Sequence, residues 1–267
     1  MFRYEPRIVG LVRFSYPARG GFARSFESDE EARAFLYDPE RLARRLALWE
    51  AMCLPSLEAQ TDARFTLLVL TGQALPPAVR ERLEAGLAGL PDGRLVALPP
   101  KPHYSALKAA FAGVERRGES HVVSFRLDDD DALARDYVAR LRRSTHRVLR
   151  VSGWDRPVVM AFNRGLYVDL GKGEIFDAVE RTPMSVGTAM AAPAGHKDNV
   201  YARNHRLLPE FYDTWQESTT PMWLRTIHRD NDSTPTVAGR SGTLDAGGID
   251  GALRRFAQDR ASLAGLG

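Results

Sequence analysis

The first half of the chain alternates short apolar runs with segments whose apolar residues recur at helical spacing. Such alternation is the signature of parallel strands joined by crossover helices. We therefore predict an α/β fold, with a mostly parallel central sheet flanked by helices and a smaller antiparallel hairpin region in the second half. Strands are predicted at residues 8–12, 65–70, 94–98 and 121–127.

The clearest sequence pattern for a helix begins at residue 38. Asp38 is expected to cap a helix that Pro39 opens. The apolar stripe of this helix includes Cys53, which we expect to be a buried structural thiol. The segment before Asp38 is interpreted as a polar insertion. Further helices are predicted at residues 76–90 and 105–117 and around Tyr137, Val138 and Leu141.

The second half changes from crossover units to a meander. Residues 158–170 and 174–180 predict two strands, joined by Gly171-Lys172-Gly173, a typical hairpin turn. A third strand is predicted at 184–192 and helical structure at 199–212. Beyond this region, a segment rich in Ser, Thr, Gly and Asp indicates flexibility, with a short helix at 249–258.

Length and composition favour one sizeable domain, because 267 residues with 44% hydrophobic content can bury a large core. No window approaches the eighteen or more apolar residues of a membrane helix, and residues 1–6 lack the apolar centre of a signal peptide. The single cysteine cannot form an internal disulfide. We therefore expect a cytoplasmic protein.

The formal net charge is only +3, but basic residues cluster on one predicted helix and its exit. They form either a solvated helix face or a peripheral contact with an anionic membrane surface at the inner face of the membrane. Nucleic acid is disfavoured as a partner, because no aromatic residues alternate with the basic ones. The cluster comprises Arg140, Arg142, Arg143, His146, Arg147 and Arg150.

Four consecutive aspartates, Asp128 to Asp131, follow the fourth predicted strand. Unpaired carboxylates at a buried strand end would repel one another and raise each other's pKa, and a divalent cation removes that cost. Ligands of open α/β sheets bind beyond the carboxyl ends of the strands. Hard oxygen ligands favour Mg²⁺ or Mn²⁺, and Mg²⁺ typically bridges carboxylates to substrate phosphates.

Alternation in an extended segment would point Asp128 and Asp130 in one direction, so that this pair could share a metal. Asp129 and Asp131 would point the other way. The competing explanation is helix capping. Asp131 precedes Ala132-Leu133-Ala134 and is equally suited to cap a following helix.

Three segments carry a family resemblance, Leu11 to Ser15, Phe125 to Asp131 and Trp223 to His228. The strand that ends in the acidic run resembles the DxD region of GT-A glycosyltransferases. Together, the three segments are similar to a bacterial family described as rhamnosyltransferases, from about Arg7 to about Asp232. The resemblance implies a metal-dependent transferase that takes a nucleotide-diphosphate sugar and gives the sugar to a glycan or lipid-linked acceptor.

The resemblance also implies roles for individual residues. Asp130 would bind Mn²⁺ or Mg²⁺, Asp128 would lie near the ribose and the metal, and His228 would complete the metal shell. Asp129 would be a secondary contact to the donor. The nucleotide and its phosphates would contact Arg13, Ser15, Lys108 and Arg126.

An inverting transfer needs a base for the acceptor hydroxyl. Asp198 is the first candidate from the family pattern, although it could instead cap a following helix. Asp169, Asp230 and Asp232 remain alternatives. His205 is expected on a helix, in contact with substrate or exposed. Structural or solvent roles are expected for the isolated histidines His103, His121, His146 and His196.

We predict one domain at 1–232, with a nucleotide-binding half at about 1–131 and an acceptor-side half at about 132–232, followed by the flexible segment 233–267. Two other functions stay open. A nucleotidyltransferase would use the basic, Gly-containing segment 17–24 after the first strand. An inactive sugar-nucleotide-binding module would have no need of clustered like charges. Walker-type phosphate binding and a recognisable glycosidase carboxylate pair are absent from the sequence.

Overall fold

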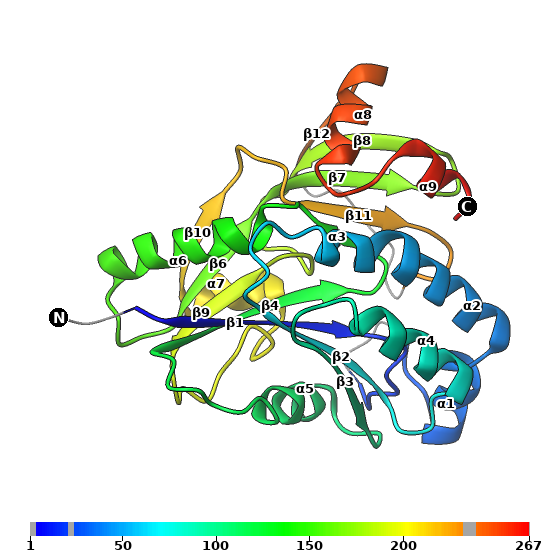
Figure 1. Ribbon diagram of the computed structural model, residues 1–267, viewed down its shortest axis with the longest axis horizontal. Coiled ribbons are helices and arrows are strands. Elements are labelled where there is room, and N and C mark those ends of the chain that lie inside the picture. The colour runs from blue at the N-terminus through cyan, green and yellow to red at the C-terminus, as the bar shows by residue number, and fades with distance from the viewer. Residues whose placement is uncertain (1–3, 21–23, 232–238, 267) are drawn as a thin grey trace.

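The computed structural model describes residues 4–20, 24–231 and 239–266. A seven-stranded sheet in the order β10-β6-β9-β4-β1-β2-β3 forms the centre of the molecule (Figure 1). Its first four strands along the chain run parallel to one another, as predicted. They are β1 (Pro6–Arg13), β2 (Thr66–Gly72), β3 (Gly93–Leu98) and β4 (His121–Asp128).

Helices cover both faces of these strands. In β1, Ile8 and Val12 belong to the core on one face, while Val9 and Leu11 belong to the core on the other. The first core is covered by α2 (Pro39–Leu48), α3 (Leu54–Glu58), α4 (Pro77–Leu87) and α6 (Tyr137–Ser152). The second core is covered by α5 (His103–Ala112) and the short α7 (Leu208–Phe211). The α/β prediction is confirmed.

The helix that begins at Pro39 has the predicted cap, since the Asp38 carboxylate accepts a hydrogen bond of 2.9 Å from the backbone N–H of Arg41. It continues through a π-helical turn, η1 (Trp49–Cys53), into α3. Cys53 is fully buried, and burial raises the pKa of its thiol. The predicted polar insertion contains a helix, α1 (Asp29–Leu36), whose mostly charged sequence gave little apolar signal.

A second sheet, in the order β12-β8-β7-β11-β5, packs beside the first. The predicted hairpin is confirmed, because β7 (Arg164–Asp169) and β8 (Glu174–Val179) pair antiparallel around residues 170–173. The predicted strand 158–170 is in fact two strands, which are separated at Asn163 and belong to different sheets. The other strands of this half are β6 (Val158–Phe162), β9 (Ala189–Pro193), β10 (Asp213–Glu217) and β11 (Trp223–Ile227).

Two local predictions are wrong. Asp131 caps no helix, since Ala132–Leu133 form the short strand β5 against β11 and α6 begins six residues later with Asp136 at its N-cap position. Residues 199–212 are mostly irregular, with only a 3-10 turn, η2 (His205–Leu207), and α7. Asp198 is therefore no helix cap either.

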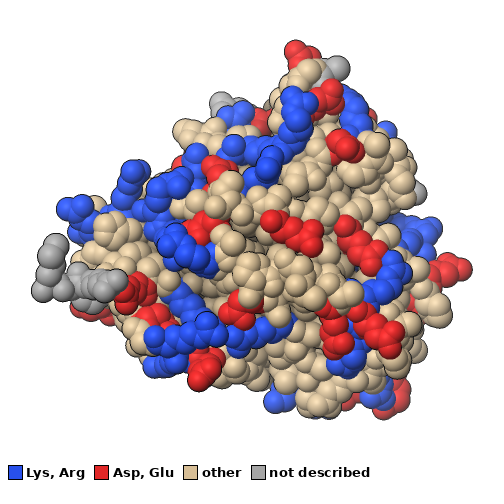
Figure 2. All heavy atoms as spheres, in the orientation of Figure 1, with Lys and Arg blue, Asp and Glu red and all other residues tan. Residues whose placement is uncertain are grey.

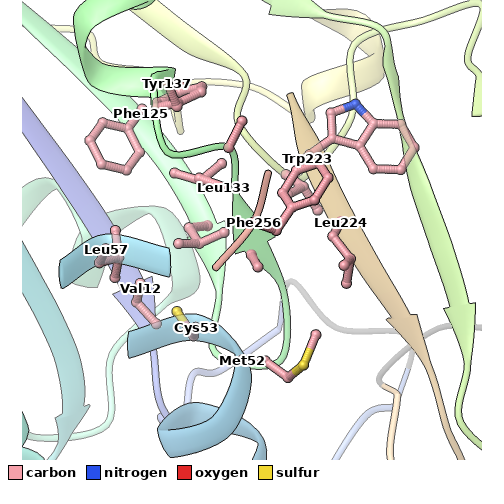
Figure 3. Packing of buried hydrophobic residues seen from close by; sticks show 14 of the residues in the cluster. Val12, Met52, Cys53, Leu57, Phe125, Leu133, Tyr137, Trp223, Leu224 and Phe256 are labelled. Carbon is pink, nitrogen blue, oxygen red and sulfur yellow. The ribbon is translucent and has the colours of Figure 1, made fainter. Parts of the chain in front are cut away.

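The chain after residue 238 is folded, where we expected flexibility around one helix. Strand β12 (Arg240–Thr243) pairs with β8, and α8 (Ala246–Arg254) and α9 (Arg260–Ala264) follow it. Phe256 is buried in the main core together with Leu133, Trp223 and Leu224 (Figure 3). Residues 232–238 of the predicted flexible segment, including Asp232, lie outside the described residues. Within the described part of the chain, no helix has the length and hydropathy that a membrane span requires.

Candidate active site

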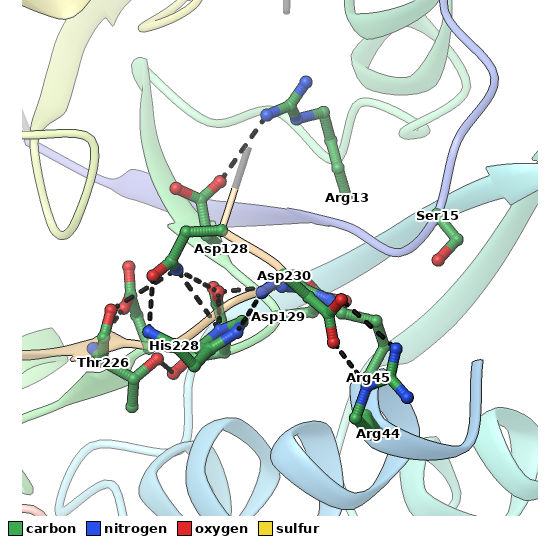
Figure 4. Close-up of polar contacts among 12 residues, drawn as sticks. Arg13, Ser15, Arg44, Arg45, Asp128, Asp129, Thr226, His228 and Asp230 are labelled. Atoms are coloured by element: carbon green, nitrogen blue, oxygen red, sulfur yellow. Dashed lines mark hydrogen bonds and ion pairs between the residues drawn. The ribbon is translucent and has the colours of Figure 1, made fainter. Parts of the chain in front are cut away.

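The acidic run lies where β4 ends, at the carboxyl edge of the parallel strands. Asp128 is the register partner of Arg13, the last residue of β1, and Arg13 Nη2 lies 3.8 Å from Asp128 Oδ1 (Figure 4). Both residues line a cavity of about 280 Å³. The position agrees with the general rule that open α/β sheets bind ligands beyond their carboxyl edge.

The four aspartates do not form an extended segment. The backbone turns after Asp128, and the N–H of Asp131 donates to the carbonyl of Asp128 at 3.2 Å. The expected alternation of Asp128 and Asp130 against Asp129 and Asp131 is therefore wrong. Asp128 keeps 27% of its side chain exposed and faces the cavity, while the other three aspartates are buried.

Arg45 on α2 compensates the buried charge. Its Nε donates to Asp129 Oδ2 at 3.1 Å and its Nη1 to Asp130 Oδ2 at 2.8 Å, while Nη2 pairs with Asp129 Oδ1 (Figure 4). All three side chains are more than nine-tenths buried. Burying carboxylates is tolerable only when they are paired in this way. Sequence reasoning missed Arg45, whose available signal was its place one turn after Arg41 on a confidently predicted helix.

Two further side chains converge on the same oxygen of Asp130. His228 Nε2 lies 2.9 Å and Asn231 Nδ2 3.1 Å from Oδ2. The backbone N–H of Asp230 donates to His228 Nδ1 at 3.2 Å, so the proton of a neutral ring sits on Nε2 and points at Asp130. Burial alone would raise the pKa of Asp130, but the Arg45 charge and the His228 hydrogen bond hold it below the ordinary value.

Asp131 differs from its neighbours. Its carboxylate accepts a hydrogen bond of 3.1 Å from the backbone N–H of Thr226, while the Thr226 hydroxyl donates to the carbonyl of Asp130 at 2.8 Å. Burial and the adjacent charge of Asp130 raise the pKa of Asp131 well above that of a free carboxyl. Asp131 therefore links the acidic run to β11.

Ser15 and Arg126 line the cavity as the family pattern implied. Ser15 has φ of 45°, a value unusual for a residue with a side chain, and its hydroxyl accepts a hydrogen bond of 3.1 Å from Arg41 Nη1. The Arg126 guanidinium lies 4.7 Å from the ring centre of Tyr201, and burial lowers its pKa. Its buried Nε has no hydrogen-bond partner among the described residues.

The structure does not bring Asp198 or Lys108 to this cavity. Both line a separate cavity on the α5 side of the sheet, where Asp198 Oδ2 accepts a hydrogen bond of 3.0 Å from the Tyr212 hydroxyl. Asp169 is paired with Lys172 and Asp230 with Arg44, and neither lines the cavity. Asp198 does not approach the acidic run, because β9 runs antiparallel to β4 and ends with Pro193 beside His121, at the opposite end of β4 from the aspartates.

Two histidines reach the cavity instead. His103, for which we expected a structural or solvent role, lies 3.5 Å from Arg13 and lines the cavity wall. Burial and the charges of Arg13 and Arg126 lower its pKa to about 3. His205 lines the cavity as well, and burial together with the charges of Arg126, Arg206 and Arg225 lowers its pKa to about 2. Both rings are neutral at physiological pH.

Arginine is the most frequent residue type in the lining of the cavity. Only two of these arginines, Arg13 and Arg126, were predicted from the sequence. Seven arginines and four aspartates line the cavity. Arg41 and Arg45 come from α2, Arg225 from β11, and two others from the segment after β9. The complete set is Arg13, Arg41, Arg45, Arg126, Arg203, Arg206 and Arg225.

The donor atoms fit a small divalent cation in part. Asp130 Oδ2 and His228 Nε2 are 2.9 Å apart, so a cation that contacted both at metal–ligand distances of about 2.1 Å would have to replace the proton that now lies between them. No group of three or more His, Cys, Asp or Glu side chains within the described residues has the arrangement of a metal site. A cation here would draw its remaining ligands from water or phosphate, as Mg²⁺ commonly does.

Fold and site together define an α/β protein whose polar, arginine-rich cavity opens at the carboxyl edge of a mostly parallel sheet. Residues 7–240 match the model of the family described as "Putative rhamnosyl transferase", and the chain belongs to that family. A comparison with curated protein sequences finds no match.

Solved structures give a distant likeness. S. aureus TarS 1–349 shares 10% identity over 82% of this chain and 60% of its own length, with a TM-score of 0.40. Its complex with UDP shares 12% identity over 83% of this chain and 60% of its own length, with a TM-score of 0.40. A "putative nucleotide-diphospho-sugar transferase" from Desulfovibrio desulfuricans shares 12% identity over 84% of this chain and 82% of that protein, with a TM-score of 0.36. The chain thus spans about three fifths of the TarS fragment.

Proposed function

We propose that this protein transfers a sugar from a nucleotide-diphosphate donor to an acceptor. The observation that carries the proposal is Asp128, an aspartate open to an arginine-lined cavity at the end of β4, with three buried aspartates behind it. Family membership over residues 7–240 supports the reaction class. Rhamnose as the sugar rests only on the description of that family.

The donor would lie along the edge shared by β1 and β4. Arg13 and Ser15 would contact the nucleotide, and Arg126, a buried cation with an unpartnered Nε, would contact the diphosphate. Charge-assisted hydrogen bonds from guanidinium groups are well suited to phosphate oxygens. These groups would stabilise the negative charge that develops on the departing nucleoside diphosphate.

Mn²⁺ or Mg²⁺ would be held by Asp130 and His228, with Asp128 and the donor phosphates close by. When bound, the cation would supply further stabilisation of the leaving group. The carboxylate of Asp129 pairs with Arg45, so Asp129 would stabilise the turn rather than contact the donor. Since Asp198 lies outside the cavity, Asp128, which faces the cavity, replaces it as the candidate to accept the acceptor's proton at this site.

The proposal is tested by thermal-shift screening of nucleotide sugars and nucleoside diphosphates with and without Mn²⁺. We expect a Mn²⁺-dependent rise in Tm with one nucleotide series. Asp130→Asn, which keeps the shape of the side chain, should abolish the Mn²⁺-dependent part of the shift, whereas Asp213→Asn on exposed β10 should not. An equal Mn²⁺-dependent shift in wild type and Asp130→Asn would refute the metal assignment.

The products separate this proposal from the nucleotidyltransferase alternative. Release of a nucleoside diphosphate from a nucleotide sugar supports glycosyl transfer. Release of pyrophosphate from a nucleoside triphosphate would support the alternative, whose basic segment 17–24 is only partly among the described residues. Nucleotide-sugar binding without turnover in the presence of a broad acceptor mixture would indicate an inactive binding module.

A further inference from the structure

Two arginines in the lining of the active-site cavity, Arg206 and Arg225, form no direct ion pair with a described residue, although the charges of the nearby acidic run outweigh burial and raise the pKa of Arg225. Arg206 follows β9 in an exposed segment and Arg225 is partly buried on β11. Neither forms an ion pair with any residue in the described ranges. Arg45 differs, because two aspartates occupy all three of its donor nitrogens.

Two further polar side chains, Ser185 and His205, line the cavity. Ser185 is only 7% exposed, its hydroxyl has no hydrogen-bond partner within the described residues, and it lines the cavity. His205 lies beside Arg206 in the chain and presents a neutral ring to the cavity. Buried polar groups are normally hydrogen-bonded, so an unpartnered hydroxyl that faces a cavity indicates a ligand.

The donor cannot account for the whole excess of positive charge. Seven arginines line the cavity against four aspartates, and Arg45 already pairs with two of those aspartates. A diphosphate contributes only about two negative charges in this type of contact. A divalent cation at Asp130 would increase the excess further. Arg206 and Arg225 therefore still lack a direct ion-pair partner among the described residues when the donor is in place beside Arg13 and Arg126.

We infer that Arg206 and Arg225, with Ser185 and His205, form a subsite for an anionic group on the acceptor, either a phosphate or a carboxylate. The inference rests on the proposed glycosyl transfer, since it names the acceptor class of that reaction. Guanidinium groups bind both anions through paired N–H donors, and the serine hydroxyl and imidazole N–H add neutral donors. A neutral glycan would leave both arginines unpaired.

The test uses the full chain with its donor site filled by the nucleoside diphosphate that binds best in the thermal-shift screen. Glycerol 3-phosphate, glucuronate and glucose are then titrated by calorimetry in phosphate-free buffer at constant ionic strength. We expect one of the two anions to bind and glucose not to bind. Arg206→Gln should weaken anion binding about tenfold, the usual effect of losing one charge-assisted hydrogen bond.

Matched variants isolate the subsite. Arg206 is exposed, so Arg206→Gln should leave folding intact. Arg225→Lys retains the positive charge but removes the paired N–H donors of the guanidinium. Both variants should bind the nucleoside diphosphate with a Kd within about twofold of wild type. Arg150→Gln on α6 should change the affinity for neither the nucleoside diphosphate nor the anion. Stronger binding of glycerol 3-phosphate would identify a phosphorylated acceptor, and stronger binding of glucuronate a carboxylated one.

Three results would overturn the inference. These are no anion binding above glucose, anion binding that Arg206→Gln and Arg225→Lys leave unchanged, and displacement of the nucleotide by the anion. A failure of the proposed function has a different signature, the absence of nucleoside diphosphate binding. In that case the same anion titration without nucleotide still decides whether the subsite exists.

Discussion

The buried guanidinium of Arg45 forms ion pairs with two neighbouring carboxylates in the interior of the molecule. Its partners Asp129 and Asp130 lie more than eighty residues away in the chain. The aspartate cluster could be predicted from the sequence as a polar site at a strand end. Its counter-ion could not, because nothing in the spacing of α2 residues reveals which distant loop they will meet.

Removing that guanidinium should destabilise the fold strongly. Arg45→Met leaves two buried carboxylates unpaired, and breaking a buried ion pair costs about 3–5 kcal/mol. We therefore expect a loss of that order in the free energy of unfolding, measured by urea denaturation at neutral pH. Arg44→Gln, which breaks the more exposed pair with Asp230, should cost at most about 1 kcal/mol.

The comparison with the triple variant Arg45→Met, Asp129→Asn, Asp130→Asn separates charge from packing. Neutral asparagines need no counter-ion, so part of the lost stability should return. Equal stability of Arg45→Met and wild type would show that Asp129 and Asp130 are protonated or otherwise compensated in the folded protein.

Helix α2 joins three loops of the site through three arginines. Arg41 contacts Ser15 after β1, Arg45 contacts the acidic turn after β4, and Arg44 contacts Asp230 after β11. The helix itself could be predicted from its cap and stripe. Where prediction failed at this scale, as in residues 199–212, the segment is held by tertiary contacts such as that of the Tyr201 hydroxyl with the carbonyl of Leu11.

The structure divides the basic cluster on α6 into two kinds of residue. Arg140 pairs with Glu217 and Arg142 with Asp62, whereas Arg143, Arg147 and Arg150 are exposed. Figure 2 shows Lys and Arg side chains gathered over the region of α6. The paired arginines serve the fold, so only the exposed ones are available to a surface of opposite charge.

If α6 contacts an anionic bilayer, the protein should sediment with vesicles of phosphatidylcholine and phosphatidylglycerol at low salt and dissociate at high salt. Exposed basic residues near such a surface contribute about 1 kcal/mol each. The variant Arg143→Gln, Arg147→Gln, Arg150→Gln should then bind at least tenfold more weakly. Binding that is equal on pure phosphatidylcholine vesicles, or absent on both, would leave these residues as a solvated helix face.

At the scale of the whole molecule, the four parallel strands of the first half were the easiest part to predict, because short, continuous apolar runs bounded by turn residues are typical of buried strands. The second half was harder. A single apolar run covers β6 and β7, yet these strands enter different sheets, and hydrophobicity alone does not mark where a chain changes sheets. The C-terminal helices were underestimated because their few apolar residues contact a core assembled from distant segments.

Phe256 tests whether those helices belong to the cooperative unit. It is fully buried among core residues from both sheets. Phe256→Ala should lower the free energy of unfolding by about 3–5 kcal/mol, the usual cost of removing a buried aromatic side chain. Leu266→Ala, at a partly buried position near the end of α9, should cost less. A single urea transition should persist in both variants, and an unchanged midpoint in Phe256→Ala would contradict this packing.

Asn163 is the residue at which the chain passes from the central sheet to the second one. Its N–H and carbonyl hydrogen-bond to the backbones of Glu217 and Glu180 at 2.7 Å each, and its side-chain amide donates to Glu180 and Gln216. Backbone and side-chain hydrogen bonds therefore hold the two sheets together at their junction, where a hinge would have few such contacts. We therefore expect any closure around the proposed donor to come from the loops at the carboxyl edge, with the two sheets keeping their relative orientation.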